Sequence, residues 1–375
     1  MKFEYSKLES DRFRKKIFKY QTTDIDINSL QKNILENEAD IVFLRIPSNQ
    51  SYQIQKLDLL GMPYIQTDTL VYYYADLAKF EPSQKTNHDI SFRKIDNSNV
   101  HKKEVERLVK KIFTSYTNHY FSNKYIDKSD IIDGYIEWVL GYCGLNKGKI
   151  GWFVEKNNIN IGFATCTFDK ESDISEGVLF GVDSDFSGKG LYGDIIRFTQ
   201  SYFKSLGINR MKVSTQVQNF AVQKVWAREG FFIKESFSTI HINSFLSSSI
   251  SKKDFIKFRI SLSDILNFGK ISGDYNPVHF NDKSAKKLGF KGVIAHGIIP
   301  NSMMSKYYGV VNPGKGTLIL SCKYKFLKPI YPEHNYEVEI SFPSKNNGIF
   351  LSVAKFYDEN KDICVIAYSD LMNRS

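Results

Sequence analysis

Hydrophobic and polar residues alternate with a period of two along four stretches in the last third of the chain. These stretches are residues 317–326, 336–342, 349–357 and 363–369. Such alternation places hydrophobic side chains on one face of an extended backbone, so each stretch is predicted as a strand. Asn347-Gly348 separates two of them and is a strong signal for a two-residue hairpin turn. The pattern therefore predicts an antiparallel meander in this part of the chain.

Hydrophobic residues at helical spacing precede this meander. Residues 261–271 are predicted as a helix with Ser263 as its N-cap. Residues 282–288 are predicted as a second, shorter helix that ends at a glycine. Residues 292–309 form a long apolar stretch, predicted as a helix that His296-Gly297 opens. The last third of the chain is thus predicted to contain helices first and antiparallel strands after them.

The segment SGDYNPVH, residues 272–279, lies between the first two of these helices. Pro277 fixes its own φ and disfavours helix at the residue before it, so the segment is predicted as a loop. In a loop, Asp274 and His279 can converge on one point. A carboxylate and an imidazole together can hold, remove and return the proton of a water molecule. The alternative is a turn rich in Asp and Asn with a solvent-exposed histidine.

The motifs SGDYNPVH, AHG and KFLKPIYP occur here in the order typical of MaoC-like (R)-specific enoyl-CoA hydratases, and residues 255–375 resemble that family. The resemblance implies a hotdog fold. It further implies that Asp274 and His279 activate the water that adds to a trans-2-enoyl thioester. The oxyanion donor is then the backbone N–H of Gly297, since enolate-like charge requires a preorganised donor. His296 is expected to be mainly structural, because a buried imidazole usually satisfies a backbone group.

The first 80 residues alternate short strands and helices. Residues 41–46 and 64–74 are predicted as strands, with a helix over residues 49–60 between them. Residues 79–89 contain Pro82 and mixed polar residues and are predicted as a linker. A second linker is predicted at Ser247-Ser248-Ser249. The first 80 residues are therefore expected to form a small accessory α/β region.

A glycine-rich loop marks the middle of the chain. Residues 151–155 and 159–168 are predicted as a hairpin, and residues 177–183 as a further strand. That strand runs into the sequence DFSGKGLYGD, whose glycines permit tight backbone turns before a helix. The free N–H groups of such a helix start can bind phosphate oxygens. The alternative is a flexible turn from strand to helix.

The residues that follow are a strand over 211–215 and a helix from Asn219 to Gly230, and with the glycine loop they resemble GNAT acyltransferases. The resemblance implies that Val182 and its strand bind the pantetheine arm of acyl-CoA. Asn219 is implied to contact the cofactor or order the loop. The resemblance assigns the CoA pyrophosphate to the backbone of Ser187, Gly188, Lys189, Gly190, Leu191, Tyr192 and Gly193.

Three residues depart from the GNAT pattern. Ser187 stands where the family usually has Arg or Gln, and Tyr192 stands where it usually has Gly or Ala. Trp226 occupies the position of a tyrosine that often protonates the leaving thiolate, and an indole N–H cannot serve as that acid. The general acid is therefore left unassigned, with water or another residue expected to take the role.

Residues 116–141 are rich in aromatic residues and resemble the acceptor-lining segment of the fucosamine N-acetyltransferase type of GNAT. That resemblance implies a nucleotide-linked amino sugar as the acceptor. His119 is the candidate base for the sugar ammonium, because imidazole titrates near neutral pH. The alternative is that the aromatic residues of this segment only pack.

Composition excludes several other classes of function. The net charge of +10 arises from dispersed lysines and no compact basic run, which favours anionic small molecules over nucleic acid. The four cysteines form no CxxC pair, so neither a metal site nor a disulfide framework is expected. Cys322 and Cys364 lie in strand patterns and are expected in the core. The chain contains no apolar run of 18 residues, so a cytoplasmic protein without a membrane segment is expected.

The predicted fold class is mixed α+β and α/β: a GNAT fold with an N-terminal accessory half-domain, followed by a C-terminal hotdog domain. The expected boundaries are residues 1–80, 89–245 and 254–375. The predicted function is a bifunctional enzyme of surface-glycan biosynthesis. Its hotdog domain would hydrate a 2-enoyl-CoA to an (R)-3-hydroxyacyl-CoA, and its GNAT domain would transfer an acyl group from acyl-CoA (acetyl-CoA or 3-hydroxyacyl-CoA) to the amine of a nucleotide-linked amino sugar. The chain is expected to form homo-oligomers through its hotdog domain. The alternative is a sugar N-acetyltransferase whose hotdog domain serves only in dimerisation or acyl-CoA binding.

Overall fold

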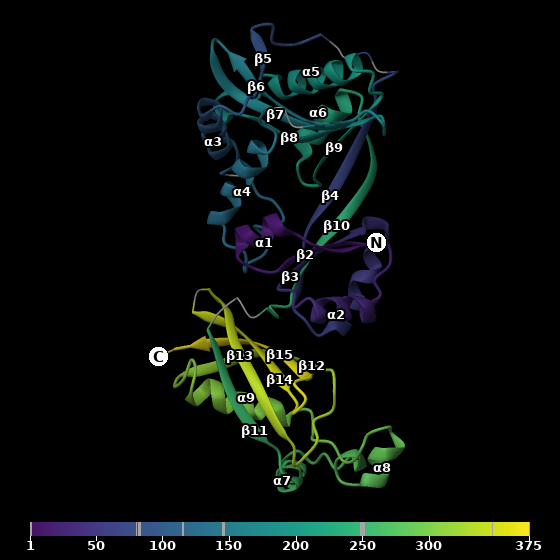
Figure 1. Cartoon of the computed structure of the whole chain (residues 1–375), viewed down its shortest axis with the longest axis vertical. Helices are drawn as coiled ribbons and strands as arrows, with labels where there is room; N and C mark the ends of the chain where they lie inside the picture. The colour runs from purple at the N-terminus through teal and green to yellow at the C-terminus, as the bar shows by residue number, and fades with distance from the viewer. Residues whose placement is uncertain are drawn as a thin grey trace.

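The computed structural model describes residues 2–79, 81, 84–114, 116–144, 147–247, 252–346 and 348–374. Two β-sheets organise these residues, one above the other along the long axis of the molecule (Figure 1). Among the helices described, none has the length and apolar character needed to cross a bilayer.

The elements before residue 244 belong to the first sheet and its covering helices. Its strands are β1 Phe3–Tyr5, β2 Ile17–Gln21, β3 Ile41–Pro47, β4 Tyr64–Asp76, β5 Ile90–Lys94, β6 Lys149–Lys156, β7 Ile159–Asp169, β8 Ile174–Val182, β9 Arg210–Gln216 and β10 Phe232–Asn243. The helices are α1 Lys7–Phe13, α2 Ile27–Glu36, α3 Asn99–Phe113, α4 Ser129–Leu140, α5 Leu191–Ser205 and α6 Phe220–Arg228, with 3-10 helices η1 Ser48–Leu60 and η2 Ser184–Phe186.

The elements after residue 252 belong to the second sheet. Its strands are β11 Lys253–Arg259, β12 Thr317–Phe326, β13 Asn335–Asn346, β14 Ile349–Tyr357 and β15 Ile363–Asn373. The helices are α7 Leu262–Ser272, α8 Asp282–Lys287 and α9 Ile299–Val310, with the 3-10 turn η3 Pro277–His279.

Strand β10 joins the accessory region to the middle block. The first sheet has the order β1-β2-β3-β10-β4-β9-β8-β7-β6-β5, so β10 lies between β3 and β4. It pairs antiparallel with both of these strands. The boundary expected near residue 80 thus separates segments of one continuous sheet, and the three-part division stays a prediction.

Strands β8 and β9 diverge in the middle of this sheet. They pair in parallel only over Ile174–Gly177 and Arg210–Val213, although β8 continues to Val182 and β9 to Gln216. The register of β8 against β7 also shifts between Thr165 and Cys166, where β8 carries an extra residue. A bulge of this kind bends a strand and ends regular pairing. The ends of β8 and β9 therefore splay apart.

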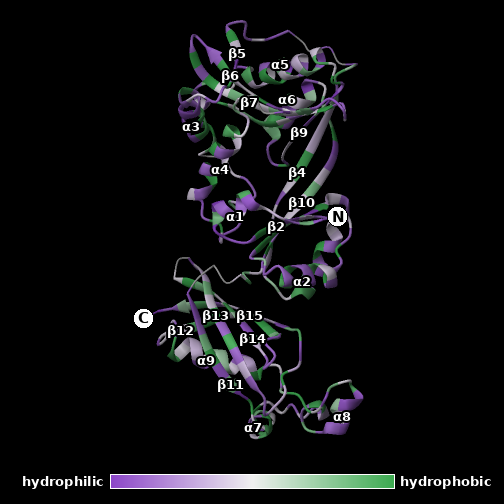
Figure 2. Cartoon of the chain, viewed as in Figure 1, coloured by the Kyte–Doolittle hydropathy of each residue, from purple (hydrophilic) through white to green (hydrophobic). Residues whose placement is uncertain are grey.

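The central strands β14 and β15 of the second sheet are buried on both faces. The sheet has the order β11-β13-β14-β15-β12, and α9 packs on one face through Met304, Tyr307 and Tyr308. The opposite face belongs to the core of the N-terminal half. In β15, Ile366 and Tyr368 join that core, and the residues that alternate with them contact the α9 side. Figure 2 shows hydrophobic residues among the strands of this sheet.

Hydrogen bonds cross the same junction between the two halves. The Tyr368 hydroxyl donates to the Ser244 carbonyl over 2.9 Å. The Lys355 ammonium donates to the Leu246 carbonyl over 3.0 Å and forms an ion pair with Glu339 at 2.7 Å. A buried ammonium requires such partners because burial removes its hydration. The two halves are thus held by apolar packing and by satisfied polar groups.

The structure corrects several expectations. The N-cap of α7 is Ser261, not Ser263, because Ser261 and Asp264 form a reciprocal capping box. Helix α9 begins at Ile299, with a proline in its first turn, so the expected start at His296-Gly297 is wrong. The helix expected over 49–60 is a 3-10 helix. Cys322 is exposed, because β12 is an edge strand.

Three predicted connections include residues that lie outside the described ones. Pro82 of the first predicted linker is one of these residues. Asn347 of the predicted hairpin lies outside the described residues, whereas Gly348 has a φ of +76°. Ser248 and Ser249 of the second predicted linker also lie outside them.

A substitution at Leu351 tests the packing of the junction. The Leu351 side chain lies in the core of the N-terminal half, although the residue belongs to β14. Replacing it with alanine is expected to lower the free energy of unfolding by about 2–5 kcal/mol, because a cavity remains at a packed site. Urea denaturation of the full chain measures this. The control Leu59→Ala, at a position that is 64% exposed, is expected to change stability little. Equal effects of the two substitutions would contradict a packed junction.

Candidate active sites

The loop of residues 273–279 is built by three local signals. Gly273 ends α7 with a φ of +73°, a conformation that glycine adopts without strain. The Asn276 side chain accepts a hydrogen bond from the N–H of Val278, and Pro277 begins the turn η3. The Asp274 carboxylate in turn accepts from the N–H of Asn276 over 3.0 Å. These bonds hold Asp274 and His279 on the same side of the loop.

Asp274 and His279 converge as the sequence suggested. The His279 Nε2 lies 4.0 Å from the Asp274 Oδ2. The other ring nitrogen, Nδ1, lies 2.8 Å from the Ile294 carbonyl oxygen. A carbonyl only accepts, so Nδ1 carries a proton, and Nε2 is the ring nitrogen that faces Asp274. That Nε2 is placed to take a proton.

His296 orders the same loop. Its Nε2 contacts the Asp274 carbonyl oxygen at 3.0 Å, and the side chain is 2% exposed. The ring stacks on that of His279 with centroids 3.9 Å apart. Because His296 satisfies a backbone carbonyl, it has the structural role expected of it, and it also fixes the positions of Asp274 and His279.

Asp274, His279 and His296 bring three ligand-type atoms within 4.8 Å of one another. Their donor types suit a transition metal. The His296 Nε2 also contacts the Asp274 carbonyl oxygen, and the His296 Nδ1 is buried without a partner among the described residues. Structural zinc sites use four protein ligands and catalytic sites three. The same three side chains could thus hold an ion or move a proton.

Gly297 lies beside this pair in an exposed turn before α9. Among the residues described, no acceptor takes its backbone N–H. A Cβ on Gly297 would come 3.1 Å from the Phe326 ring, so the turn has little room for a side chain. A free N–H here can donate to a developing oxyanion. The 4.0 Å gap between carboxylate and imidazole suits a bridging water.

The glycine loop before α5 has the conformation that a phosphate-binding turn requires. Gly188 and Gly190 have φ values of +76° and +78°, and Gly190 is the N-cap of α5. Leu191 is buried and anchors the helix start. The first N–H groups of a helix have no intrahelical acceptor and attract anions. The loop lies beyond the end of β8, where β8 and β9 diverge.

A clamp on this loop was not predicted from the sequence. The buried Asp194 carboxylate accepts from the backbone N–H of Thr86 over 2.6 Å and of Asn87 over 3.1 Å. The Asn87 amide also donates to the Lys189 carbonyl over 2.9 Å. Arg197 holds Asp194 from the other side at 2.8 Å. The sign of this clamp in the sequence was Asp194, an acidic residue in the first turn of the predicted helix.

The remaining predicted cofactor residues line the same region. Val182 ends β8 opposite Gly162. The Ser187 N–H donates to the Ser184 carbonyl over 3.1 Å, and the Tyr192 and Phe180 ring centroids lie 6.3 Å apart.

Asn219 lies just after the end of β9. Its side chain caps no N–H of α6 but donates to the Thr215 hydroxyl over 3.0 Å. At Gly193, a Cβ atom would come within 3.4 Å of the side chains of Arg197 and Glu229. The roles of all these predicted residues in binding acyl-CoA stay predictions.

His119 lies in a chain of buried polar groups. Its Nδ1 is 2.8 Å from the Nε2 of His241, whose Nδ1 is 3.1 Å from the Asn123 amide. Burial, with the nearby His241, holds the pKa of His119 well below its usual range. Burial also lowers the pKa of His241 to about 3. The role of His119 as base stays a prediction, and its ring already has a partner.

The aromatic residues near His119 pack as the structural alternative expected. Tyr116, Tyr120, Phe121 and Tyr125 contact the core of the N-terminal half. The Tyr116 hydroxyl also donates to the Gln216 side chain at the tip of β9. Burial raises the pKa of Tyr116, so its hydroxyl keeps its proton at neutral pH.

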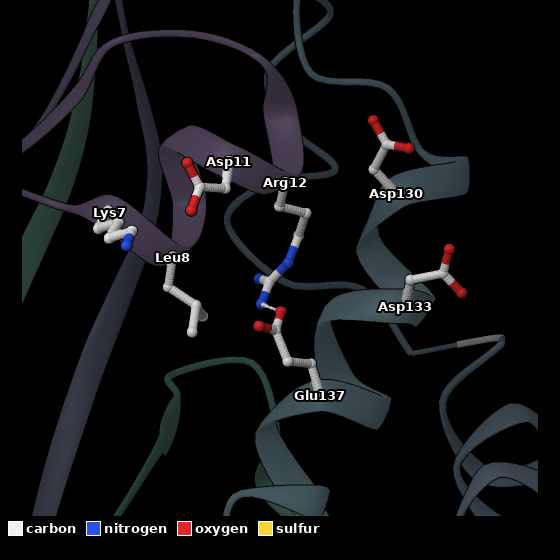
Figure 3. A pocket seen from close by; sticks show the side chains of 7 residues that line it. All are labelled: Lys7, Leu8, Asp11, Arg12, Asp130, Asp133 and Glu137. Carbon is white, nitrogen blue, oxygen red and sulfur yellow. Dashed lines mark hydrogen bonds and ion pairs between the residues drawn. The ribbon is translucent and has the colours of Figure 1, made fainter.

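An open pocket of about 590 Å³ lies between α1 and α4, away from both loops (Figure 3). Its walls include Lys7, Leu8, Asp11, Arg12, Asp130, Asp133 and Glu137. Arg12 forms an ion pair with Glu137 at 2.9 Å, and Arg14 forms one with Asp130 at 2.9 Å. These contacts connect the accessory region to α4 and have a structural role.

Two family comparisons agree with this geometry. The acetyltransferase (GNAT) family matches residues 109–231, and the MaoC like domain family matches residues 248–355. Both families indicate enzymatic activity. The chain carries a GNAT acetyltransferase domain followed by a MaoC-like hotdog domain, the fold class that the sequence predicted.

Curated relatives match the hotdog part of the chain. The 3-hydroxybutyryl-CoA dehydratase of Methylorubrum extorquens is 32% identical over 87 residues, which cover 23% of this chain and 55% of that protein. The (R)-specific enoyl-CoA hydratase of Aeromonas caviae is 25% identical over 121 residues, covering 32% and 90%. The chain spans 55% and 59% of the length of the first two curated relatives.

Solved structures match each half. The (R)-hydratase from A. caviae involved in PHA biosynthesis covers 34% of this chain and 98% of its own, with 21% identity and a TM-score of 0.32. A GCN5-related N-acetyltransferase from Sphaerobacter thermophilus covers 54% and 60%, with 10% identity and a TM-score of 0.42.

The variant Gly190→Val tests the phosphate loop. A β-branched residue at a φ of +78° is strained, so the backbone is expected to move and the affinity for acyl-CoA at the GNAT domain to fall. Transferase KM for acyl-CoA measures this effect.

The matched control is Gly207→Val, at a φ of +77° with open space around it, beyond the other end of α5. This control carries a similar backbone strain but should leave the KM unchanged. An equal KM for wild type and Gly190→Val would place the pyrophosphate elsewhere.

Proposed function

We propose that the chain is a bifunctional cytoplasmic enzyme of surface-glycan biosynthesis. The hotdog domain hydrates a 2-enoyl-CoA to an (R)-3-hydroxyacyl-CoA. The GNAT domain transfers an acyl group from acyl-CoA to the amine of a nucleotide-linked amino sugar. The observation that carries the proposal is the convergence of Asp274 and His279 beside the free N–H of Gly297.

The hydration step follows from this geometry. A water between Asp274 and the His279 Nε2 loses a proton to the pair, and its oxygen adds to the β-carbon of the enoyl thioester. The electron pair moves to the thioester oxygen, where the Gly297 N–H donates to the developing charge. The pair then returns a proton to the α-carbon. The sum is one water added, with no oxidant or metal needed.

The transfer step uses the opening between β8 and β9. The pantetheine arm would enter this opening, with its pyrophosphate at the start of α5. The amine then attacks the thioester carbon directly, the C–S bond breaks, and free CoA leaves. Burial raises the pKa of the Cys166 thiol, and Cys143 shows a rise to about 11, so neither is primed as a nucleophile.

The two proposed sites lie at opposite ends of the molecule. Helix α5 and strands β8 and β9 are at one end of the long axis, and α7 and α8 are at the other (Figure 1). The hydroxyacyl-CoA made at one site therefore reaches the other by release and diffusion. Because both domains are on one chain, they are present in equal amounts. The proposal needs no direct channel between the two sites.

The proposed homo-oligomer pairs two hotdog domains along β12. This edge strand carries Leu318, Ile319 and Leu320 in succession, with exposures of 45%, 38% and 48%. An exposed apolar edge strand is a template for pairing with another strand. A second copy of the chain would cover it.

The variant Leu318→Lys tests this pairing. A buried ammonium without a partner is costly, so the variant is expected to shift the full chain from dimer toward monomer. Light scattering at micromolar concentration measures the mass. Val100→Lys, at a position that is 75% exposed on α3, is the control and should leave the mass unchanged. A monomeric wild type would refute the proposal.

Asp274→Asn tests the hydratase and its link to transfer. Wild type given crotonyl-CoA and a nucleotide-linked 4-amino sugar should form a hydroxyacyl sugar, detected by mass spectrometry. The variant should not, because an amide cannot take the water proton. It should still transfer preformed 3-hydroxybutyryl-CoA, since the GNAT domain is unchanged.

The alternative is a hotdog domain that serves only in dimerisation or acyl-CoA binding. It predicts that wild type leaves crotonyl-CoA unconsumed and shows no preference for a hydroxyacyl donor over acetyl-CoA. That result would replace the bifunctional proposal.

A further inference from the structure

Three polar residues form a row across neighbouring strands of the first sheet. Arg45 of β3 is opposite Thr239 of β10, and Thr239 is opposite Asp68 of β4. Directly paired residues in an antiparallel sheet share a face. The three side chains thus project from the same face, and His241, two residues along β10, places His119 on that face as well.

Two buried polar atoms of this row lack a hydrogen-bond partner among the described residues. The Asp68 Oδ1 and the Thr239 hydroxyl are fully buried, and neither has a hydrogen-bond partner among the described residues. Within the same described ranges, the Arg45 guanidinium makes no hydrogen bond or ion pair. Buried polar groups are nearly always satisfied, so these two atoms beside the half-buried Arg45 guanidinium call for an occupant. Burial raises the pKa of Asp68, and the Thr239 side chain, the charge of Arg45 and the Gln216 side chain oppose that rise.

The row lies next to the opening between β8 and β9. The last pair of β4 with β9 is Leu70 with Gln216, and Asp68 is the next residue of β4 on that face. A bulge at Thr67 reorients the strand there. The Tyr116 hydroxyl bonds to Gln216, and the Ser122 hydroxyl donates to the Thr67 carbonyl over 3.1 Å. Asp68 is thus held just beyond the tip of β9, on the side of residues 116–122.

We propose that Asp68 and Arg45 bind the acceptor of the transfer reaction, and that this acceptor is an amine which also carries an anionic group. Asp68 binds the ammonium and takes its proton, and Arg45 binds the phosphate or carboxylate. The Thr239 hydroxyl lies between them and donates to the acceptor. This inference rests on the proposed transferase function and assigns its substrate class.

The proton balance of the step is complete. The acceptor ammonium gives one proton to the Asp68 carboxylate, and the neutral amine attacks the thioester carbon. When the C–S bond breaks, the thiolate takes the second proton from the attacking nitrogen. The products are an amide and free CoA, and protonated Asp68 releases its proton to solvent. His119 is not needed as a base, and its ring is bonded to His241.

The experiment compares two acceptors that differ in charge. One is a nucleoside-diphosphate-linked 4-amino-4,6-dideoxyhexose, and the other is the methyl glycoside of the same amino sugar, which has no phosphate. Arg45→Met is expected to raise the KM for the nucleotide-linked acceptor about tenfold or more and leave that for the glycoside unchanged. Asp68→Asn is expected to lower kcat/KM about 100-fold for both acceptors. Asp68→Glu should recover part of that loss.

Two exposed residues of the accessory region provide matched controls. Arg14→Met and Asp58→Asn remove the same charges at positions outside the row and should leave both acceptors unaffected. Binding of acetyl-CoA by each variant reports whether the fold is intact, since the pyrophosphate loop is separate from the row.

The outcomes separate this inference from the proposed function. If wild type acylates neither amine, the transferase proposal fails. If wild type acylates the nucleotide-linked amine but Arg45→Met affects both acceptors equally, or neither, the assignment of Arg45 is overturned. If Asp68→Asn keeps wild-type kcat/KM while His119→Asn loses it, His119 is the base and the assignment of Asp68 fails.

Discussion

Burial of the central hotdog strands β14 and β15 on both faces is the constraint on which the rest of the structure depends. One face packs against α9 and the other against the core of the N-terminal half. The apolar surface removed from water here drives the association of the two halves. The Lys355 ammonium can lie in this junction because Glu339 and the Leu246 carbonyl satisfy it. The GNAT domain and the hotdog domain are therefore parts of one packed body.

This packing decides what remains available for function. The ends of α7 and α9 and residues 318–322 of the edge strand β12 stay exposed, which leaves the Asp274 loop open and an apolar edge to be covered. Farther along β12, Lys323 and Lys325 donate to the carbonyls of Met62 and Leu59 in the N-terminal half. At the other end, β10 returns between β3 and β4 and brings Thr239 between Arg45 and Asp68. The same strand that unites the sheet thus builds the row of polar groups beside the β8–β9 opening.

Local patterns in the sequence predicted most elements, and long-range pairing accounts for what they missed. Period-two alternation located β12, β14 and β15, and the loop chemistry of residues 272–279 brought Asp274 and His279 together. Arg45, Thr239 and Asp68 are far apart in the sequence, so only strand register reveals that they share a face. The signal for Asp68 was a lone acid within the strand YIQTDTLVYYY. The Ser261 cap was missed because two serines, 261 and 263, compete locally.

The chain is proposed to hold two acyl-CoA sites at opposite ends of one body. Hydrogen–deuterium exchange with and without 3-hydroxybutyryl-CoA tests this proposal most directly, because each site is a short loop with its own backbone amides. The account predicts protection of residues 187–193 and of residues 273–279 together with 296–298. Protection of only one of these regions, or of neither, would contradict the account.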